Sequence, residues 1–396
     1  MRGIRRRTGA VAVAIATALA AVGCAGQQTQ TTEDGLGDAP IKLGFMWEIK
    51  GESAYAIDDY DRGAAIAVEE INRAGDITVE TVRLPASPVD PQALNTNFLK
   101  MTEEKPTVIV GIPGTNIESL TRAIDNARIP VIGIVQNSNI NFGAPNGSEW
   151  LFQAYTSQYN YASSAARYLI EELKVKSVGI MHTDEALGTS GAAVFAEVFA
   201  DAGVPIIATR SYATSATDLT EQVLAMRDAD AVINWGYPNP MAVQLKQFVQ
   251  NGITIPTMQT QSAALNVANG VVEGEAIANL YSAQFCNATD PGTEAGRRFI
   301  AAYQEKFGSP PTANAMITYD AVRFAAAAIR AANSTDPVKV RDAIRTIKFT
   351  DGACTDDYHA DGAHVLMHQI LIIDFPEGKG RTLKKYTFPD DLKVTS

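Results

Sequence analysis

Two spacings of apolar residues recur along this chain, and together they predict strands and helices in regular alternation. The clearest case lies between Val108 and Asn139. Val108 to Gly111 is an unbroken apolar run, which is typical of a buried strand. Apolar or small side chains then recur at the spacing of one buried helical face, at Ile117, Leu120, Ile124 and Ala127. Pro130 ends that helix and Val131 to Val135 is a second apolar run, so the stretch predicts a strand–turn–helix–strand unit of a parallel sheet.

Polar residues follow both strands of this unit. Thr115 and Asn116 come after the first strand, at the start of the predicted helix, where unpaired backbone N–H groups attract an anion. Gln136, Asn137 and Ser138 come after the second strand. Because parallel strands end at the same sheet edge, where open α/β sheets place their ligands, we expect half of a small-molecule anion site here. An ordinary α/β repeat with a polar turn explains the same residues equally well.

The alternation continues on both sides of this unit and predicts two lobes, which suits a length of 396 residues. One strand–helix series occupies 41–155 and a second starts near Ser157, which predicts two parallel sheets. Three consecutive helices and a late apolar strand, Val365 to Phe375, complete the pattern. This order predicts an N-terminal lobe of 41–155 plus 285–364 and a C-terminal lobe of 156–284 plus 365–396. Three crossings between them predict a hinge.

The first 24 residues have the composition of an export signal. Arginines near the start are followed by the apolar stretch Gly9 to Val22, which is too short for a stable membrane span. The stretch closes on Ala21-Val22-Gly23-Cys24, which resembles the lipobox of bacterial lipoproteins and implies lipid attachment at Cys24. A plain secretory cleavage nearby is the alternative. Residues 25–40, rich in Gln, Thr, Gly and Asp, predict a flexible tether.

Cysteine usage and charge narrow the picture further. With Cys24 assigned to the lipid, Cys286 and Cys354 remain, and an even pair outside the cytoplasm predicts a disulfide. Two reduced, buried thiols are the alternative. The formal net charge is −11, and no basic patch with interleaved aromatic residues is present. We therefore expect no nucleic-acid partner.

Several short motifs recur in a specific order. They are IKLGF from Ile41, RGAAIAVEEINRAG (Arg62 to Gly75), DPQAL (Asp90 to Leu94), VIVG with Thr115, DAVINWGYPNPM (Asp230 to Met241) and TYDAV (Thr318 to Val322). In this order the chain resembles, over about Ile41 to Phe375, the type I periplasmic binding proteins. The resemblance is to the branched-chain amino-acid class of substrate-binding proteins for ABC transporters. It implies an α/β fold of two doubly wound lobes, joined by a three-strand hinge, which close on a ligand like a Venus flytrap.

The resemblance also implies which residues touch the ligand. In that family a carboxylate is held on the first lobe by backbone N–H groups and by polar residues at the positions of Thr115, Gln136 and Ser138. These groups can donate charge-assisted hydrogen bonds to an anion. On the second lobe, the family's aromatic residue corresponds to Tyr237. The family's tyrosine in the loop after the strand ending near His182 is replaced by Leu187.

One departure from the family bears directly on the ligand. The glutamate that takes the ligand ammonium in that family corresponds to Gln261, which is neutral. Leaving a buried cation unpaired is costly, so either a nearby carboxylate replaces that charge or the ligand has no α-ammonium. Asp184, Glu185 and Glu48 are candidates for the carboxylate. Among several aromatic residues that are candidates for an apolar wall, we expect Trp47 and Tyr55 to contact the ligand.

These features predict an extracytoplasmic solute-binding protein, anchored to the outer face of the cytoplasmic membrane through Cys24 and monomeric. It would deliver a small carboxylate-bearing solute, such as a branched-chain or other apolar amino acid, to an ABC permease. The alternatives are a non-amino-acid ligand (an aromatic or keto acid, an amide or urea) and a ligand-sensing module. No phosphate-binding loop, nucleophile elbow or metal-type cysteine spacing occurs, so we expect no enzyme, cofactor or metal. His364 and His368 are read as surface or hinge residues.

Overall fold

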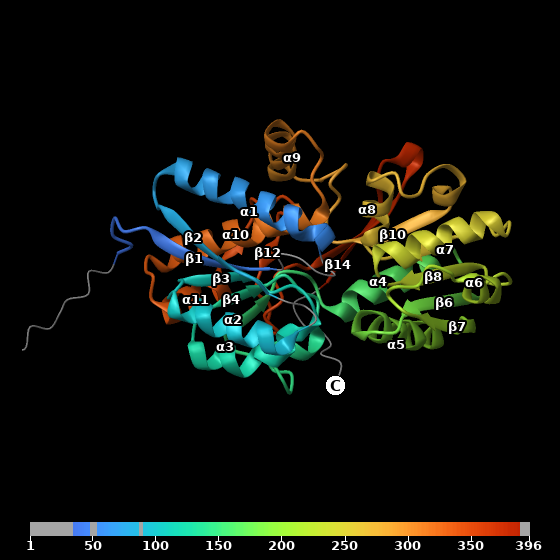
Figure 1. The fold of residues 1–396 in the computed structure, drawn as a ribbon, viewed down its shortest axis with the longest axis horizontal. Coiled ribbons are helices and arrows are strands. Elements are labelled where there is room, and N and C mark those ends of the chain that lie inside the picture. The colour runs from blue at the N-terminus through green and yellow to red at the C-terminus, as the bar shows by residue number, and fades with distance from the viewer. Residues whose placement is uncertain (1–34, 48–53, 87–89, 389–396) are drawn as a thin grey trace, which may run out of the picture. The chain divides into compact units, whose positions relative to one another are not determined.

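The computed structural model describes residues 35–47, 54–86 and 90–388, and its strands form two large sheets (Figure 1). The first sheet has the order β2-β1-β3-β4-β5, with every neighbouring pair parallel. Its strands are β1 (Ile41–Met46), β2 (Val79–Leu84), β3 (Val108–Gly111), β4 (Val131–Gly133) and β5 (Leu151–Gln153). This sheet agrees with the predicted parallel arrangement.

The second sheet has the order β14-β13-β10-β9-β8-β6-β7 and is mixed. Its strands are β6 (Val178–Thr183), β7 (Ile206–Tyr212), β8 (Ala231–Trp235), β9 (Thr257–Gln259), β10 (Leu280–Gln284), β13 (Gln369–Asp374) and β14 (Arg381–Thr387). β13 runs antiparallel to β10, and β14 runs antiparallel to β13. The strands of the predicted series, β6 to β10, pair in parallel as expected, and the antiparallel addition of β13 and β14 was not predicted. β13 and β14 join through the short 3-10 turn η4 (Pro376–Gly378), and such a tight connection reverses the chain.

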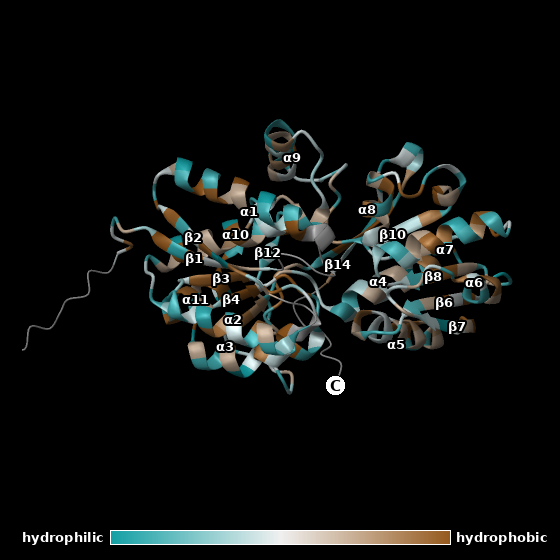
Figure 2. Cartoon of the chain, viewed as in Figure 1, coloured by the Kyte–Doolittle hydropathy of each residue, from teal (hydrophilic) through white to brown (hydrophobic). Residues whose placement is uncertain are grey.

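Helices cover both sheets. In and around the first sheet they are α1 (Ala54–Ala74), α2 (Pro91–Glu103), η1 (Thr115–Leu120), α3 (Thr121–Ala127), η2 (Ser138–Ile140), α9 (Glu294–Phe307), α10 (Ala313–Ala332) and α11 (Pro337–Thr346). With the second sheet lie α4 (Gln158–Glu171), α5 (Ala186–Asp201), α6 (Thr220–Ala225), α7 (Pro238–Gln250), α8 (Ser262–Ala268) and η3 (Gly274–Ile277). Apolar colours gather on the strands of both sheets, whereas the helices carry polar colours as well (Figure 2). Along the described ranges, no helix combines the length and apolar composition that crossing a membrane requires.

Several helix starts follow from local sequence. Asp90 accepts the N–H groups of Gln92 and Ala93, and Pro91 occupies the first turn of α2, where a missing N–H costs nothing. The close packing of α1 on α10 depends on a missing side chain, because a Cβ on Gly63 would lie 2.2 Å from the Ala315 carbonyl oxygen. Only glycine permits this approach.

The chain passes between the two sheets three times: after β5, after β10 and before β13. A disulfide joins Cys286, just after β10, to Cys354, which lies between the short strands β11 (Lys348–Phe349) and β12 (Tyr358–His359). The predicted pairing is therefore confirmed. The bridge closes a loop of 68 residues and ties the second crossing to the segment that leads into the third.

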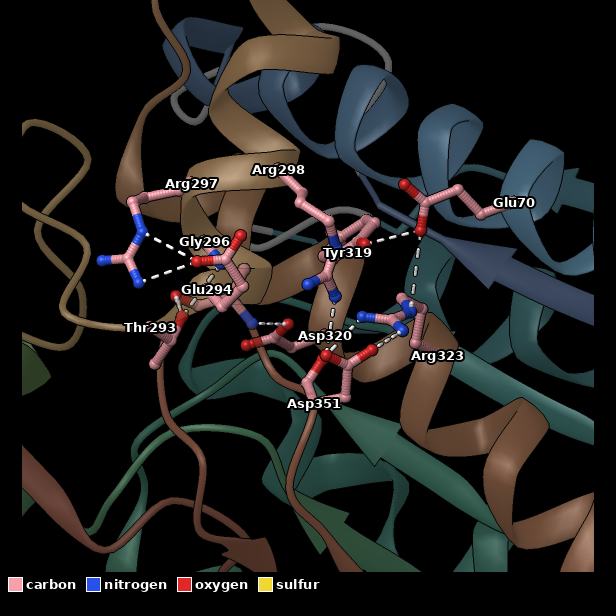
Figure 3. A network of polar contacts seen from close by, with 11 residues as sticks. Glu70, Thr293, Glu294, Gly296, Arg297, Arg298, Tyr319, Asp320, Arg323 and Asp351 are labelled. Carbon is pink, nitrogen blue, oxygen red and sulfur yellow. Dashed lines mark hydrogen bonds and ion pairs between the residues drawn. The ribbon is translucent and has the colours of Figure 1, made fainter.

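A polar network supports this disulfide (Figure 3). Both carboxylate oxygens of Asp320 in α10 accept backbone N–H groups, from Ala353 at 2.6 Å and from Cys354 at 2.8 Å. Arg323, one turn along, pairs with the carboxylate of Asp351 and donates to its carbonyl at 2.6 Å. Complete burial raises the pKa of Asp320 to about 7, although the two N–H donors oppose that rise. The network fixes the loop that carries Cys354 against α10.

Some elements were not predicted. The stretch from Glu275 to Ala283 is divided between the short helical turn η3 and β10. The helix α8 was absent from the prediction, as were β11, β12 and β14. Each of these elements is short, and short elements take their form from neighbouring structure more than from their own apolar pattern.

Candidate functional site

A large cavity lies where strands of both sheets end. Its volume is about 1170 Å³. Its lining residues follow the carboxyl ends of β3, β4 and β5 in the first sheet and of β6, β8 and β9 in the second. This is the edge at which open parallel sheets bind ligands. The volume exceeds the ~300–1,000 Å³ of ordinary small-molecule pockets, so a single small metabolite would leave room for water.

The first wall of the cavity carries neutral polar groups. Gln136 and Ser138 line it, together with Gly114. The buried side chain of Gln153 holds the loop in place, because its Oε1 accepts the Asn137 N–H at 2.6 Å. The backbone N–H groups of Gln136 and Ser138 have no hydrogen-bond acceptor among the residues that the structure describes. This wall therefore presents donors to the cavity. Thr115 begins η1 at the same place, but its side chain lies outside the described structure.

The second wall combines aromatic and amide side chains. Tyr237, Gln261 and Asp184 line it. The turn that carries Tyr237 is held by Thr260, whose hydroxyl donates to the Gly236 carbonyl at 2.9 Å. Leu187, which replaces the family's tyrosine, also lines the cavity. The structure thus brings Gln136, Ser138, Tyr237, Gln261 and Asp184 around one space, as the sequence predicted for a shared site; their contacts with a ligand stay a prediction.

The backbone of Gln261 is anchored on Tyr161. The Gln261 N–H donates to the Tyr161 hydroxyl at 2.7 Å, and Tyr161 in turn lies within hydrogen-bond distance of the Ala283 carbonyl oxygen, at 3.2 Å. The Tyr161 ring packs against Trp235, with ring centroids 4.6 Å apart. Trp235 is fully buried behind the wall and packs closely on α5, where a Cβ on Gly191 would lie 2.4 Å from the indole. The second wall therefore rests on a rigid aromatic support.

Two polar residues of the lining were not singled out from the sequence. Gln158 opens α4 and is 7% exposed, and Asn314 lies in the first turn of α10. Asn314 Oδ1 accepts the Tyr155 hydroxyl at 3.2 Å and the Gln261 amide at 3.5 Å. Both residues sit just after a helix-capping residue, Ser157 or Thr312. The capping signal marks the helix start, but it does not reveal that the next side chains face a cavity.

The charged side chains that line the cavity in the described structure are all acidic. Glu118, Asp184, Glu185 and Glu197 line it, and the described lining contains no lysine, arginine or histidine. Glu185 caps α5 by accepting the Leu187 and Gly188 N–H groups. Glu197 accepts the Tyr159 hydroxyl at 3.2 Å, and burial, assisted by this carboxylate, raises the pKa of Tyr159. An anion bound here must be held by neutral donors.

One residue expected at the site, Trp47, lies elsewhere. Trp47 does not line the cavity: it is fully buried, stacks on Phe45 and donates its indole N–H to Asp61 at 2.8 Å. The indole N–H of Trp47 therefore already has a hydrogen-bond acceptor within the first lobe. The side chain of Tyr55, like Glu48 and Cys24, falls outside the described residues.

The side chains of His364 and His368 pack against other rings of the protein. His364, expected at the surface or hinge, is buried between Phe142 and Phe152, with ring centroids 4.6 Å and 4.4 Å away. Burial lowers its pKa to about 4, with nearby Arg345 adding to the effect. His368 stacks on His359 instead. In the parts of the chain that the structure describes, no group of three or more metal-binding side chains comes together.

A second, smaller cavity of about 100 Å³ adjoins the first. It is mostly apolar and shares Gln261, Ser262, Leu265 and Asn314 with the main cavity. Cys286 of the disulfide also lines it. The pair formed by Gln261 and Asn314 thus belongs to both spaces.

Comparison with known proteins agrees with this geometry. Leu/Ile/Val-binding protein homolog 8 of Brucella melitensis is 23% identical over 343 residues, covering 81% of this chain and 83% of the relative. Homolog 7 of Brucella suis is 23% identical over 344 residues, covering 81% and 84%.

Solved structures show the same fold. The leucine-binding protein LivK of Thermotoga maritima superposes with a TM-score of 0.77 at 19% identity, covering 89% of this chain and 100% of its own. The isoleucine complex of LivJ from Streptococcus pneumoniae gives 0.75 at 22% identity, covering 88% and 99%. A solute-binding protein of Rhodopseudomonas palustris in complex with 3,4-dihydroxybenzoic acid gives 0.76 at 18% identity, covering 88% and 97%.

Residues 40–379 match the family model described as periplasmic binding protein. This match spans most of the chain, and the strand orders and cavity are those of two α/β lobes around a solute site. The chain therefore belongs to the periplasmic binding protein family, in the type I, branched-chain amino-acid class of solute-binding proteins that serve ABC transporters.

Proposed function

We propose that this protein captures a small carboxylate-bearing solute, about the size of a branched-chain amino acid, and delivers it to an ABC importer. The observation that carries the proposal is the pairing of the two walls. One wall offers backbone N–H groups and the Ser138 hydroxyl without any basic side chain, and the other offers Tyr237, Leu187 and amide groups. A carboxylate suits the first wall and an apolar body suits the second.

The mechanism is capture followed by closure. The carboxylate binds first to the donors around Gln136 and Ser138, since these are fixed by Gln153 and need little rearrangement. The second lobe then moves toward the solute about the three crossings and excludes water, which strengthens every polar contact. The closed form is what the permease recognises.

In this proposal, a lipid anchor at the N-terminus determines where in the cell envelope the protein is held. Cleavage before Cys24 and acylation of its thiol would hold the protein on the outer face of the cytoplasmic membrane, as a monomer. Metabolic labelling with a palmitate analogue would mark the wild type and leave a Cys24→Ala variant unlabelled. Equal labelling of both would refute the anchor.

A second candidate ligand is an aromatic acid. Tyr155, Tyr159 and Tyr237 line the cavity, and a benzoate ring would pack on such side chains. The Rhodopseudomonas palustris neighbour in complex with 3,4-dihydroxybenzoic acid gives this candidate its weight. An aromatic acid has no ammonium, so it would not require a carboxylate partner in the second wall.

A thermal-shift screen over apolar amino acids, benzoates, keto acids and short amides tests the proposal, because bound solute raises the melting temperature. For the strongest hit, Ser138→Ala should weaken binding by about tenfold or more, since a charge-assisted hydrogen bond contributes ~1.5–3 kcal/mol. The matched control is Ser190→Ala on the opposite side of the cavity, where the hydroxyl donates to the Ala186 carbonyl at 2.6 Å and is not needed by the solute. Equal affinities of the two variants would refute the carboxylate cradle.

A further inference from the structure

Two of the three crossings between the sheets leave the first sheet side by side. Gln153 is the last residue of β5, and Val365 pairs with it in a parallel bridge. The Gln153 N–H donates to the His364 carbonyl at 2.9 Å, and the Gln153 carbonyl accepts the Leu366 N–H at 2.9 Å. Both α4 and β13 of the second sheet begin only a few residues further along the chain. This paired exit from the first sheet therefore lies at the predicted hinge.

The loop that carries the donors of the first wall is bonded to this exit near both of its ends. We call residues 136–142 the donor loop. Near its start, the Asn137 N–H donates to Oε1 of Gln153 at 2.6 Å. At its end, the Phe142 N–H donates to the Ala363 carbonyl at 3.0 Å. The N–H groups that face the cavity therefore belong to a loop whose two ends are held by neighbouring parts of the hinge.

His364 connects the donor loop to the first sheet through its ring. The ring lies between Phe142 of the loop and Phe152 of β5, with centroids 4.6 Å and 4.4 Å away. Its Nε2 accepts from Nε of Arg345 at 3.2 Å, so Nδ1 carries the proton and donates to the Leu151 carbonyl at 3.1 Å. The backbone of His364 has a φ of 64°, in the left-handed region, which a residue other than glycine keeps only where its surroundings fix it. These contacts hold His364 in one orientation.

We propose that His364 is a positioning residue for solute capture, because it holds the donor loop and the paired exit together as one rigid unit. The inference rests on the proposed function, in which N–H groups of this loop bind the carboxylate of the solute. Since the hinge lies beside the donors, the second lobe can turn while the donors keep their places on the first. The solute then meets preformed donors, and little binding free energy is lost in ordering the loop.

Amide hydrogen exchange of the full chain without solute tests this unit, with fragmentation in the mass spectrometer to resolve single N–H groups. Phe142 is 38% exposed, so Phe142→Ala removes the ring contact at small cost to the fold. Exchange of the Asn137 N–H should then rise by about three- to tenfold, from the lost ring stacking, although its own acceptor on Gln153 is unchanged. His364→Asn should give the same rise, because asparagine tolerates the left-handed backbone but lacks the ring.

The matched controls lie outside the donor loop. They are Leu383→Ala, 36% exposed on β14, and His368→Asn, a buried histidine whose ring stacks on another histidine. Both should leave exchange of the Asn137 N–H at the wild-type rate. A wild-type rate in Phe142→Ala and His364→Asn would overturn the proposal. A rise of equal size along the whole chain would overturn it too, because that result reports a global loss of stability.

Isothermal titration calorimetry with L-leucine and with sodium benzoate extends the test to solute capture. The probe that binds the wild type should bind His364→Asn about three- to tenfold more weakly, by the same factor as the rise in exchange, because a smaller fraction of the protein has its donors in place. Leu383→Ala should bind it like the wild type. Equal affinities of the wild type and His364→Asn would overturn the positioning role. Failure of the wild type to bind either probe would count against the proposed function alone, and the exchange rates would then decide the inference.

Discussion

The hydroxyl of Tyr161 connects the core of the second lobe to the cavity wall, so its removal offers a sharp test of how the site is supported. Tyr161 is 1% exposed, and its ring packs against Trp235 and Phe285. Tyr161→Phe keeps that ring and removes only the oxygen. The Gln261 N–H then loses its acceptor, and the contact with the Ala283 carbonyl is lost as well.

The magnitude follows from these two contacts. A buried donor left unpaired costs about 1–3 kcal/mol, and the second, ordinary hydrogen bond adds about 1 kcal/mol, so the free energy of unfolding should fall by about 2–4 kcal/mol. No cavity term applies, because the ring remains. The same change should weaken solute binding several-fold, since it frees the backbone of Gln261.

Urea denaturation followed by circular dichroism measures the effect. The matched control is Tyr159→Phe, two residues earlier on the same helix, whose hydroxyl bonds the exposed Glu197. Surface changes of this kind usually alter stability by less than about 0.5 kcal/mol. If Tyr161→Phe unfolds at the same urea concentration as Tyr159→Phe, the proposed support of the cavity wall is wrong.

Three further predictions concern the scaffold. Reduction of the disulfide, which closes a loop of 68 residues, should lower the free energy of unfolding by roughly 4 kcal/mol in the loop-entropy model, as measured by urea denaturation with and without reductant. Burial raises the pKa of Asp320 from 3.8 to about 7, so the folded state holds this proton more tightly; stability from this group is present below pH 3.8 and is lost as pH rises to about 7. Asp320→Asn should remove that pH dependence, and identical pH profiles of unfolding would contradict the assignment. Gly191→Ala, which drives a Cβ into Trp235, should destabilise the protein by about 1–3 kcal/mol, whereas Gly362→Ala, with nothing within 4 Å, should be near neutral in the same thermal melts.

The regular part of the fold was readable because its apolar pattern repeats. The bounds of α1, β3, β8 and α10 agree with the spacing of apolar residues, since long or fully buried elements carry a strong period. The direction of β13 was not readable. It depends on the path by which three preceding helices return the chain to the second sheet, and no local pattern encodes that path.

The site could be predicted only in part from the sequence, because local patterns do not encode tertiary packing. Gln136 and Ser138 were found because strand ends mark the ligand edge, and Gln261 was found through the family resemblance. Gln158 opens a helix, and its contact with the cavity arises from tertiary packing around Tyr161. Trp47 also follows a strand, but its indole is used by Asp61 inside the first lobe. The rule that locates strand ends does not determine where each side chain points.

A crystal structure of the protein with its solute bound tests the central claim most directly. The account predicts a solute inside the main cavity, with its carboxylate within hydrogen-bond distance of the Ser138 hydroxyl and of a backbone N–H in the loop that carries Gln136. A solute bound outside this cavity, or one whose carboxylate faces the wall formed by Asp184 and Glu185, would contradict it.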